Sequence, residues 1–198
     1  MIQPDHIPQI NGDIEAVARH GQTLKTKAKE FADTGLDVHT RWQGLAAFYH
    51  APEAATLLTA TAPVKTKAAC IAYDLTVIGD ALITYSDTVR PLQQRLSTLW
   101  TEACALHAIV DGHDDWNKDR QKVAENNRLI TEVDAAVAHW QAAERTCANQ
   151  INALFDGIHW VRDNVDGIHQ DNEYYLFLFY LNLNFYNVSI ILLLFRDH

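Results

Sequence analysis

The segment DGHDDW, residues 111–116, gathers side chains that bind metal ions readily. Asp111, Asp114 and Asp115 supply carboxylate oxygens and His113 supplies a ring nitrogen, so this donor set suits a divalent cation. The same residues stand where a helix C-terminus, a turn and a helix N-terminus are needed, and Asp and Gly are favoured at those positions. We therefore interpret the segment as a turn between two helices and expect no metal site.

Other reactive residues do not form a recognisable constellation. Cys70, Cys104 and Cys147 are too far apart in the sequence for a metal knuckle or a redox pair, and we expect buried or partly buried helix thiols. The ten histidines are scattered, and neither His139 nor His159 has an evident acidic partner. Phosphate loops, nucleophile elbows and dinucleotide fingerprints are missing from the sequence. We expect a chain that is not an enzyme, with no catalytic residue and no cofactor.

Composition favours long helices in one domain, or in one domain plus a tail. The chain has 198 residues, of which 48% are hydrophobic, with 8 glycines and 5 prolines. Lys and Arg number 16 against 25 Asp and Glu, and the net charge of -9 disfavours nucleic acid as a partner. The first ten residues, MIQPDHIPQI, lack the basic and apolar regions of a Sec signal peptide.

A first long helix is expected after a loose N-terminus, residues 1–11, with Asn11 or Asp13 as its cap. Gly21 and Gly35 occupy two positions of its apolar face, at a cost of about 1 kcal/mol each in helix propensity. The other positions of that face follow helical spacing. They are Ile14, Val17, Leu24, Ala28, Phe31, Val38 and Trp42.

The helical pattern breaks at Trp42-Gln43-Gly44. A short helix is expected to restart at Pro52, because proline suits the first helical position, and Glu53 then lies favourably in the first turn. This helix should run to about Thr61, before a new start at Pro63.

A heptad seam of unusual regularity follows. Its apolar residues are alternately four and three positions apart from Val64 to Val110, and we expect a kink or short break at Pro91 and an end at Asp111-Gly112. The seam comprises Val64, Ala68, Ile71, Leu75, Ile78, Leu82, Tyr85, Val89, Leu92, Leu96, Leu99, Ala103, Leu106 and Val110.

A last long helix should begin after a cap at Asp114 or Asp115 and close at Gly157. Its seam comprises Val123, Asn126, Ile130, Val133, Val137, Trp140, Glu144, Cys147, Ile151 and Leu154, with Asn126 and Glu144 as polar interruptions. The resulting fold class is all-α: an elongated antiparallel helical hairpin or bundle with three major helices and a short helix after the Trp-x-Gly turn. The packing residues that we single out are Ile71, Leu75, Ile78, Leu82, Leu92, Leu96, Leu99 and Trp140.

The composition changes abruptly near Tyr175, so we divide the chain into residues 1–11, a helical domain 12–157, a linker 158–173 and a hydrophobic tail 174–198. Residues 174–195 carry no charge and are long enough to span a bilayer, although several asparagines lie near the middle. Three interpretations stay open: a tail anchor, a segment that docks on the helical body, and sequence introduced by a frameshift, premature end or assembly junction.

The Trp42-Gln43-Gly44 break resembles that of the WXG hairpin proteins of type VII secretion, found in actinobacteria and Firmicutes. In that family the glycine allows a tight turn. The tryptophan packs across the hairpin end and helps to form a surface used in export and partner pairing.

Further blocks are similar to the N-terminal module of large actinobacterial toxins, over roughly residues 12–175. They are WQGLAAFYHAPEA, DDWNKDRQKVAENNRLITEV, AAERTCANQINAL and DGIHQDNEYY. In those proteins the all-helical module is regarded as a type VII secretion signal, and a variable catalytic domain follows it.

The export signal of the family is often Tyr, three residues, then Asp or Glu, placed after the second helix. At this spacing Tyr85 is followed by Val89, and a Trp replaces the Tyr in Trp140 and Glu144. Tyr49 and Glu53 fit but lie just after the turn. The turn and export residues implied by the resemblance are Trp42, Gly44, Tyr49, Pro52 and Glu53.

The resemblance implies a non-catalytic secretion-targeting module of a type VII-exported effector or toxin, with the effector domain absent or truncated. It would be secreted without a signal peptide, and its partner would be the secretion machinery or a helical protein, as a homodimer or heterodimer. The alternative is a coiled-coil scaffold or interaction protein, tail-anchored in the membrane by residues 174–195. A helical enzyme with a buried site is a third hypothesis.

Overall fold

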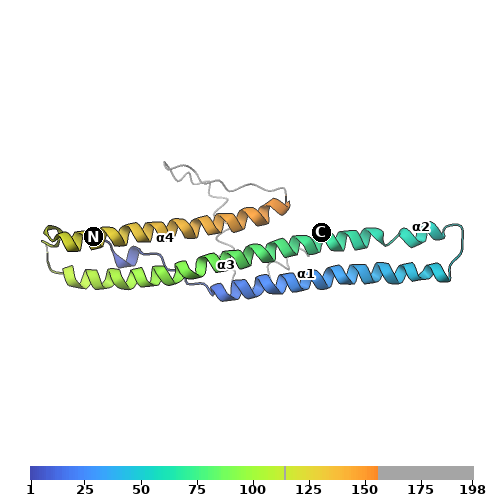
Figure 1. Cartoon of the computed structure of the whole chain (residues 1–198), viewed down its shortest axis with the longest axis horizontal. Helices are drawn as coiled ribbons and strands as arrows, with labels where there is room; N and C mark the ends of the chain where they lie inside the picture. Colours follow the sequence, from blue (N-terminus) through green and yellow to red (C-terminus); the bar gives the residue numbers. More distant parts are fainter. Residues whose placement is uncertain (114, 156–198) are drawn as a thin grey trace. The chain divides into compact units, whose positions relative to one another are not determined.

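The computed structural model describes residues 1–113 and 115–155, and within them every regular element is helical. The all-α prediction with three main helices is therefore confirmed for this part (Figure 1). The main helices are α1 (Ile14–Gln43), α3 (Ala62–Val110) and α4 (Arg120–Asn152). The short ones are α2 (Ala54–Thr59) and the 3-10 turns η1 (Pro4–His6), η2 (Gly44–Ala47), η3 (Trp116–Lys118) and η4 (Ala153–Phe155).

Local signals explain where the main helices begin and end. Asp13 caps α1 by accepting a 2.8 Å hydrogen bond from the backbone N–H of Ala16, and Gly112 follows α3 with a φ of 73°. The cap of α4 is Asp119, which accepts hydrogen bonds from two backbone N–H groups, so the prediction of Asp115 was wrong. Asp115 instead precedes the 3-10 turn η3, and Asp114 lies outside the described residues.

The helix α3 runs without a break through Pro91, contrary to the expected interruption. Proline removes the hydrogen bond to the carbonyl of Asp87, one turn earlier. Both residues are exposed, so water can satisfy that carbonyl. A proline on the outer side of a well-packed helix is therefore tolerated.

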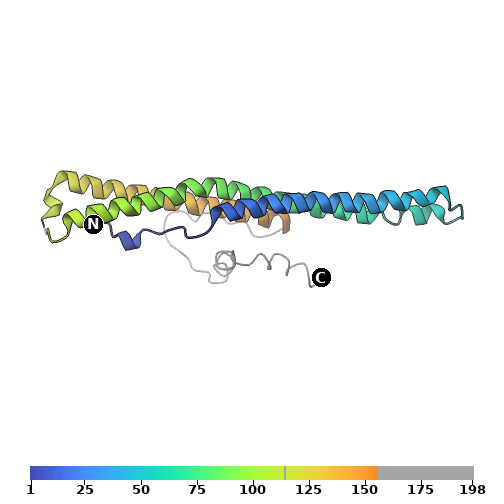
Figure 2. The same ribbon diagram turned by 90° about the horizontal axis from the view of Figure 1, so that it is seen from below.

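The first half of α3 packs against α1, and the two helices lie side by side in Figures 1 and 2. Gly21 lies against Gly79, and Gly35 lies against Ala68. A Cβ atom added to Gly21 would lie 2.7 Å from the carbonyl oxygen of Gly79, and one added to Gly79 would lie 2.6 Å from that of Gly21. The two backbones touch, and the buried Gly21 and Gly35 make this approach possible.

Polar groups fix the register of α1 on α3. The buried Ser86 hydroxyl donates a 2.7 Å hydrogen bond to the carbonyl of Ile14. Lys25 pairs with Asp80 at 2.6 Å, and Arg90 pairs with Glu15. Ser86 supplies the most specific contact, because its fully buried hydroxyl needs a hydrogen-bond partner and finds it on α1.

The second half of α3 packs against α4 around fully buried leucines, Leu96, Leu99 and Leu129. An ion-pair network flanks them. Arg128 contacts Glu102 at 2.6 Å across the two helices and Glu132 at 2.8 Å within α4. Arg95 also pairs with Glu132, so two arginines of different helices share one set of carboxylates.

The N-terminal residues are part of the core, so the expected loose start was wrong. Ile2, Ile7 and Ile10 are buried in the cluster that contains Leu96 and Leu129. The buried Asn126 accepts a 2.7 Å hydrogen bond from the backbone N–H of Ile2. The polar interruption of the α4 seam thus has a partner that periodicity cannot reveal.

The predicted packing residues divide into three groups. Ile78, Leu82, Leu96 and Leu99 are buried, whereas Leu75, Leu92 and Trp140 are partly buried. Ile71 is 39% exposed, which corrects its assignment as a packing residue. Near its level the contact with α1 is made by the buried Ala68, which lies against Gly35.

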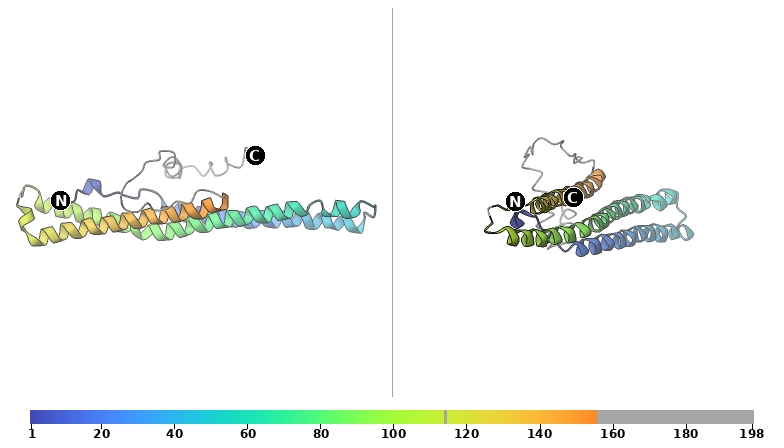
Figure 3. Two further views of the ribbon diagram at one scale, coloured as in Figure 1. Left: turned by 90° about the horizontal axis from the view of Figure 1, so that it is seen from above. Right: turned by 60° about the vertical axis from the view of Figure 1, so that its left-hand side comes forward.

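The exposure of Ile71 follows from the length of α4, which ends well before the α2 end of α3 (Figure 3). Near the C-terminal end of α4, Ile151 and Leu154 pack against Ile78, Leu82 and Leu24. Beyond the end of α4, four residues continue the heptad spacing of Leu24 and of Ile78, and they are 39–48% exposed. They are Phe31 and Val38 on α1, and Ile71 and Val64 on α3; we call them the uncovered rows.

The Gly21–Gly79 contact predicts that a single methyl group destabilises the fold. Gly79→Ala should lower the free energy of unfolding by about 1–2 kcal/mol, after allowing about 1 kcal/mol for improved helix propensity. Urea denaturation measures the change. Gly44→Ala is the matched control: a Cβ there meets nothing within 4 Å, and its φ of -60° suits alanine, so stability should rise by about 0.4–1 kcal/mol. Unchanged stability in Gly79→Ala would contradict a tight approach.

Candidate functional site

The residues around the Trp-x-Gly break tie the end of α1 to α2. The indole N–H of Trp42 donates a 2.6 Å hydrogen bond to the carbonyl of Leu57, and the side-chain amide of Gln43 donates one to the carbonyl of Leu58. These bonds satisfy carbonyls near the C-terminal end of a helix too short to be stable alone. Trp42, which is partly buried, thus holds α2 in place.

Gly44 does not make the chain reverse, which corrects the role expected for it. Its φ and ψ are -60° and -20°, ordinary right-handed helical values. The chain continues through the 3-10 turn η2, and the break in helical structure lies between Phe48 and Glu53. Any small residue fits the geometry of position 44, so a requirement for glycine there would come from a partner.

Pro52 and Glu53 precede α2 and do not open it, because the helix begins at Ala54. Glu53 occupies the N-cap position without a side-chain capping bond. Its carboxylate instead accepts a 2.5 Å hydrogen bond from the phenol of Tyr49. That bond raises the pKa of Tyr49 and lowers the pKa of Glu53, because the ionised carboxylate is the better acceptor.

Of the three pairs considered for an export signal, only Tyr49 and Glu53 form an accessible pair. Val89, at the required distance from Tyr85, is fully buried. Trp140 and Glu144 lie where α4 meets α3, and burial raises the pKa of Glu144. In the sequence Tyr49 and Glu53 are the one pair of the three with both required residue types, and their accessibility is consistent with that match.

Apolar side chains beside this pair face solvent. Phe48 is 87% exposed and Leu45 is 37% exposed. A phenyl ring so exposed loses the free energy that its burial would provide, roughly 1.5–3 kcal/mol. Together with Tyr49 and Glu53 these residues form a small surface that we call the turn surface, which sequence reasoning identified only in part.

The metal-like cluster of the inter-helix turn has little structural basis. Asp111, His113 and Asp115 are exposed, and no group of at least three His, Cys, Asp or Glu residues in the described part is arranged to hold a metal ion. Cys104 and Cys147 are partly buried, but Cys70 is exposed, contrary to expectation. Its place on α3 lies beside the uncovered rows, where α4 no longer covers the helix.

The segment Ala54–Val110 is the one helical stretch of the described residues that is long and apolar enough to cross a membrane, and an 18-residue window within it has a mean hydropathy of 1.3. Length and composition alone carry little weight, because a core helix passes the same test. Here α3 packs on both α1 and α4. The linker 158–173 and the tail 174–198 lie outside the described residues.

The chain matches no family model, no curated protein and no solved structure. The residues of the turn surface are therefore interpreted from their own geometry and chemistry.

The Trp42 hydrogen bond predicts a modest loss of stability in Trp42→Phe. The phenyl ring keeps most of the apolar contact, but the carbonyl of Leu57 loses its donor, at a cost of about 0.5–1.5 kcal/mol. Trp100→Phe, on α3, is the matched control, because Trp100 is 42% exposed, and it should change the unfolding free energy by less than about 0.5 kcal/mol. Equal effects of the two substitutions in chemical denaturation would contradict a specific role for the indole N–H.

Proposed function

We propose that residues 12–157 form a non-catalytic targeting module for type VII secretion, which delivers an attached effector domain without a signal peptide. The observation that carries this proposal is the turn surface. Its Tyr49–Glu53 hydrogen bond joins the two residues of the export pattern at 2.5 Å, in an accessible position. The Trp42 bond to Leu57 holds the neighbouring short helix.

The arrangement of α1 and α3 supports the same proposal. An antiparallel hairpin presents its connecting turn at one end, as the WXG resemblance implies. The opposed pairing of Gly21 with Gly79 and of Gly35 with Ala68 fits such a hairpin. Secretion machinery that recognises a folded hairpin would contact the turn surface first. The partner in this proposal is a component of that machinery.

Export can be tested in an actinobacterial host with active type VII machinery, by comparing culture supernatant with cell lysate. Tyr49→Ala and Glu53→Gln should each lower the exported fraction about tenfold, which corresponds to a loss of about 1.4 kcal/mol in recognition. Tyr73→Ala is a matched control, because Tyr73 lies on α3 and is 66% exposed.

Gly44→Ala separates recognition from folding in the same assay. An added Cβ meets no atom within 4 Å, so a loss of export in this variant would mean that the machinery contacts position 44 directly. Retention of the wild-type chain inside cells that export a control substrate would contradict the proposed function.

The uncovered rows favour a second candidate, a helical scaffold or interaction protein. Phe31, Val38, Val64 and Ile71 expose apolar surface at heptad spacing, which is the pattern that another helix covers. This candidate predicts a dimer in light scattering that Ile71→Glu disrupts, with Ser97→Glu on the same helix as the control. Its membrane anchor, residues 174–195, would be tested by membrane fractionation with and without that segment.

A further inference from the structure

The two halves of α4 are held to α3 by very different contacts. In the first half, Leu129 is fully buried, Val133 is buried, and Arg128 pairs with Glu102 of α3. The hydrogen bond from Ile2 to Asn126 adds a buried anchor. Apolar burial, ion pairs and a long-range hydrogen bond therefore reinforce one another over residues 120–136.

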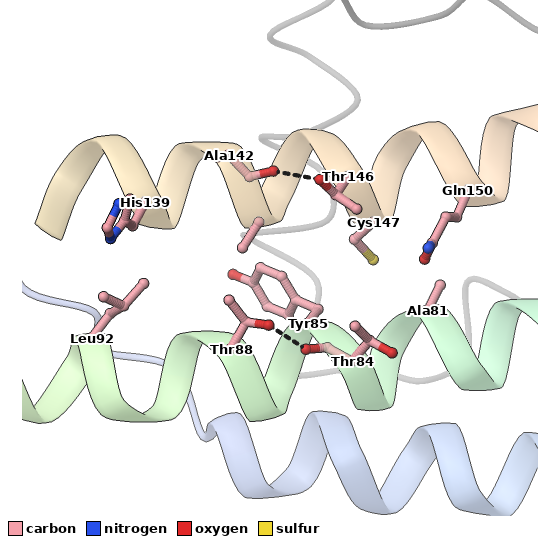
Figure 4. A pocket seen from close by; sticks show the side chains of 11 residues that line it. Ala81, Thr84, Tyr85, Thr88, Leu92, His139, Ala142, Thr146, Cys147 and Gln150 are labelled. Carbon is pink, nitrogen blue, oxygen red and sulfur yellow. Dashed lines mark hydrogen bonds between the residues drawn. The ribbon is translucent and has the colours of Figure 1, made fainter. Parts of the chain in front are cut away.

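The second half of α4, residues 137–152, is separated from α3 by a groove of about 470 Å³ (Figure 4). Thr84, Tyr85 and Thr88 of α3 face Ala142, Thr146 and Cys147 of α4 across it. Ala148 is the single buried residue of this half. The small and polar side chains across the groove provide little apolar contact. Beside it, Val137, Trp140 and Ile151 pack against the core but stay only partly buried.

A carboxylate weakens this half further. Glu144 occupies a seam position, and burial raises its pKa, while a hydrogen bond from the Trp140 side chain and the guanidinium of Arg145 partly oppose the rise. From α3 it is faced by the phenol of Tyr85, whose pKa burial raises to about 12, and on α4 by the thiol of Cys147, whose pKa is raised to about 11. Near this end α1 contributes Val17 and Leu24, which carry no charge. Trp140 and Arg145 therefore compensate the charge of Glu144 only in part.

We propose that the second half of α4 detaches from α3 as a unit while the first half stays docked, and that the charge of Glu144 promotes this opening. The groove marks the weak boundary, and the leucine cluster with its ion pairs marks where detachment stops. Opening would expose Ile78, which continues the row of Val64 and Ile71, together with the neighbouring Leu82. The second half of α4 is thus an intramolecular cover that a competing apolar helix can displace. This inference does not depend on the export proposal.

The sign of the pH dependence follows from the direction of the shift. A carboxyl with a higher pKa in the docked state binds its proton more tightly there than in the detached state. The docked state therefore loses stability as the pH rises from the ordinary value of 4.5 through the raised value, and the loss is complete above it. Opening is most frequent at neutral pH.

Hydrogen exchange of the wild-type full chain tests the unit of opening. Backbone amides of residues 140–152 should exchange at least tenfold faster than those of residues 122–136 at neutral pH, after correction for intrinsic rates. Equal protection of the two halves would overturn the proposal, because α4 would then open only as a whole.

Thiol labelling tests the role of Glu144. In a Cys70→Ser, Cys104→Ser background, Cys147 reports opening through its reaction with 4,4′-dithiodipyridine, normalised to the unfolded chain at each pH. Glu144→Gln should slow labelling roughly three- to tenfold at neutral pH and abolish its rise between acidic and neutral pH. Asp134→Asn, an exposed carboxyl on the first half of the same helix, should leave both unchanged. An unchanged rate in Glu144→Gln would overturn the role of the charge.

Discussion

The contact between Gly21 and Gly79 is the constraint on which the rest of the described structure depends. Each residue lacks a side chain where the other helix has a carbonyl oxygen, so α1 and α3 approach at backbone distance. This approach places Ser86 against the carbonyl of Ile14 and Lys25 against Asp80. The position of α1 in turn sets where the N-terminal residues enter the space between α3 and α4.

The helix α3 is a shared support whose two halves serve different partners. Its first half contacts α1 through small residues, whereas its second half contacts α4 through leucines and charged pairs. Small residues give close approach with little buried apolar area, and leucines give area at a larger separation. One continuous helix can combine both kinds of contact, because Pro91, which lies between its two halves, is on its exposed side.

Much of the helical architecture could be predicted because apolar spacing and terminal residues report local structure directly. Asp13 caps the start of α1 and Gly112 follows the end of α3, as their residue types suggest. Gly21 and Gly35 are buried, as their positions on the apolar face of α1 suggest. The partner of Asn126 could not be predicted, because the N-terminal residues have no periodicity. The exposure of Ile71 depends on where α4 ends relative to α3, which a single helix pattern does not contain.

The candidate site was predicted in type but not in detail. Spacing and residue type identified Tyr49 with Glu53, and the packing of α3 and α4 buries the two imperfect matches wholly or in part. A motif also specifies residue types without backbone angles, so the ordinary helical φ of Gly44 could not be foreseen. The exposed Phe48 belongs to no motif, and only the surface itself reveals it.

The hydrogen bond between Ile2 and Asn126 has a consequence for the order of folding. These partners are 124 residues apart, and the apolar neighbours of Ile2 come from α3 and α4. During synthesis α1 and α3 can pair first, because most of their mutual contacts do not involve α4. Ile2, Ile7 and Ile10 therefore reach their buried positions only after α4 has emerged, and they stay available to chaperones until then.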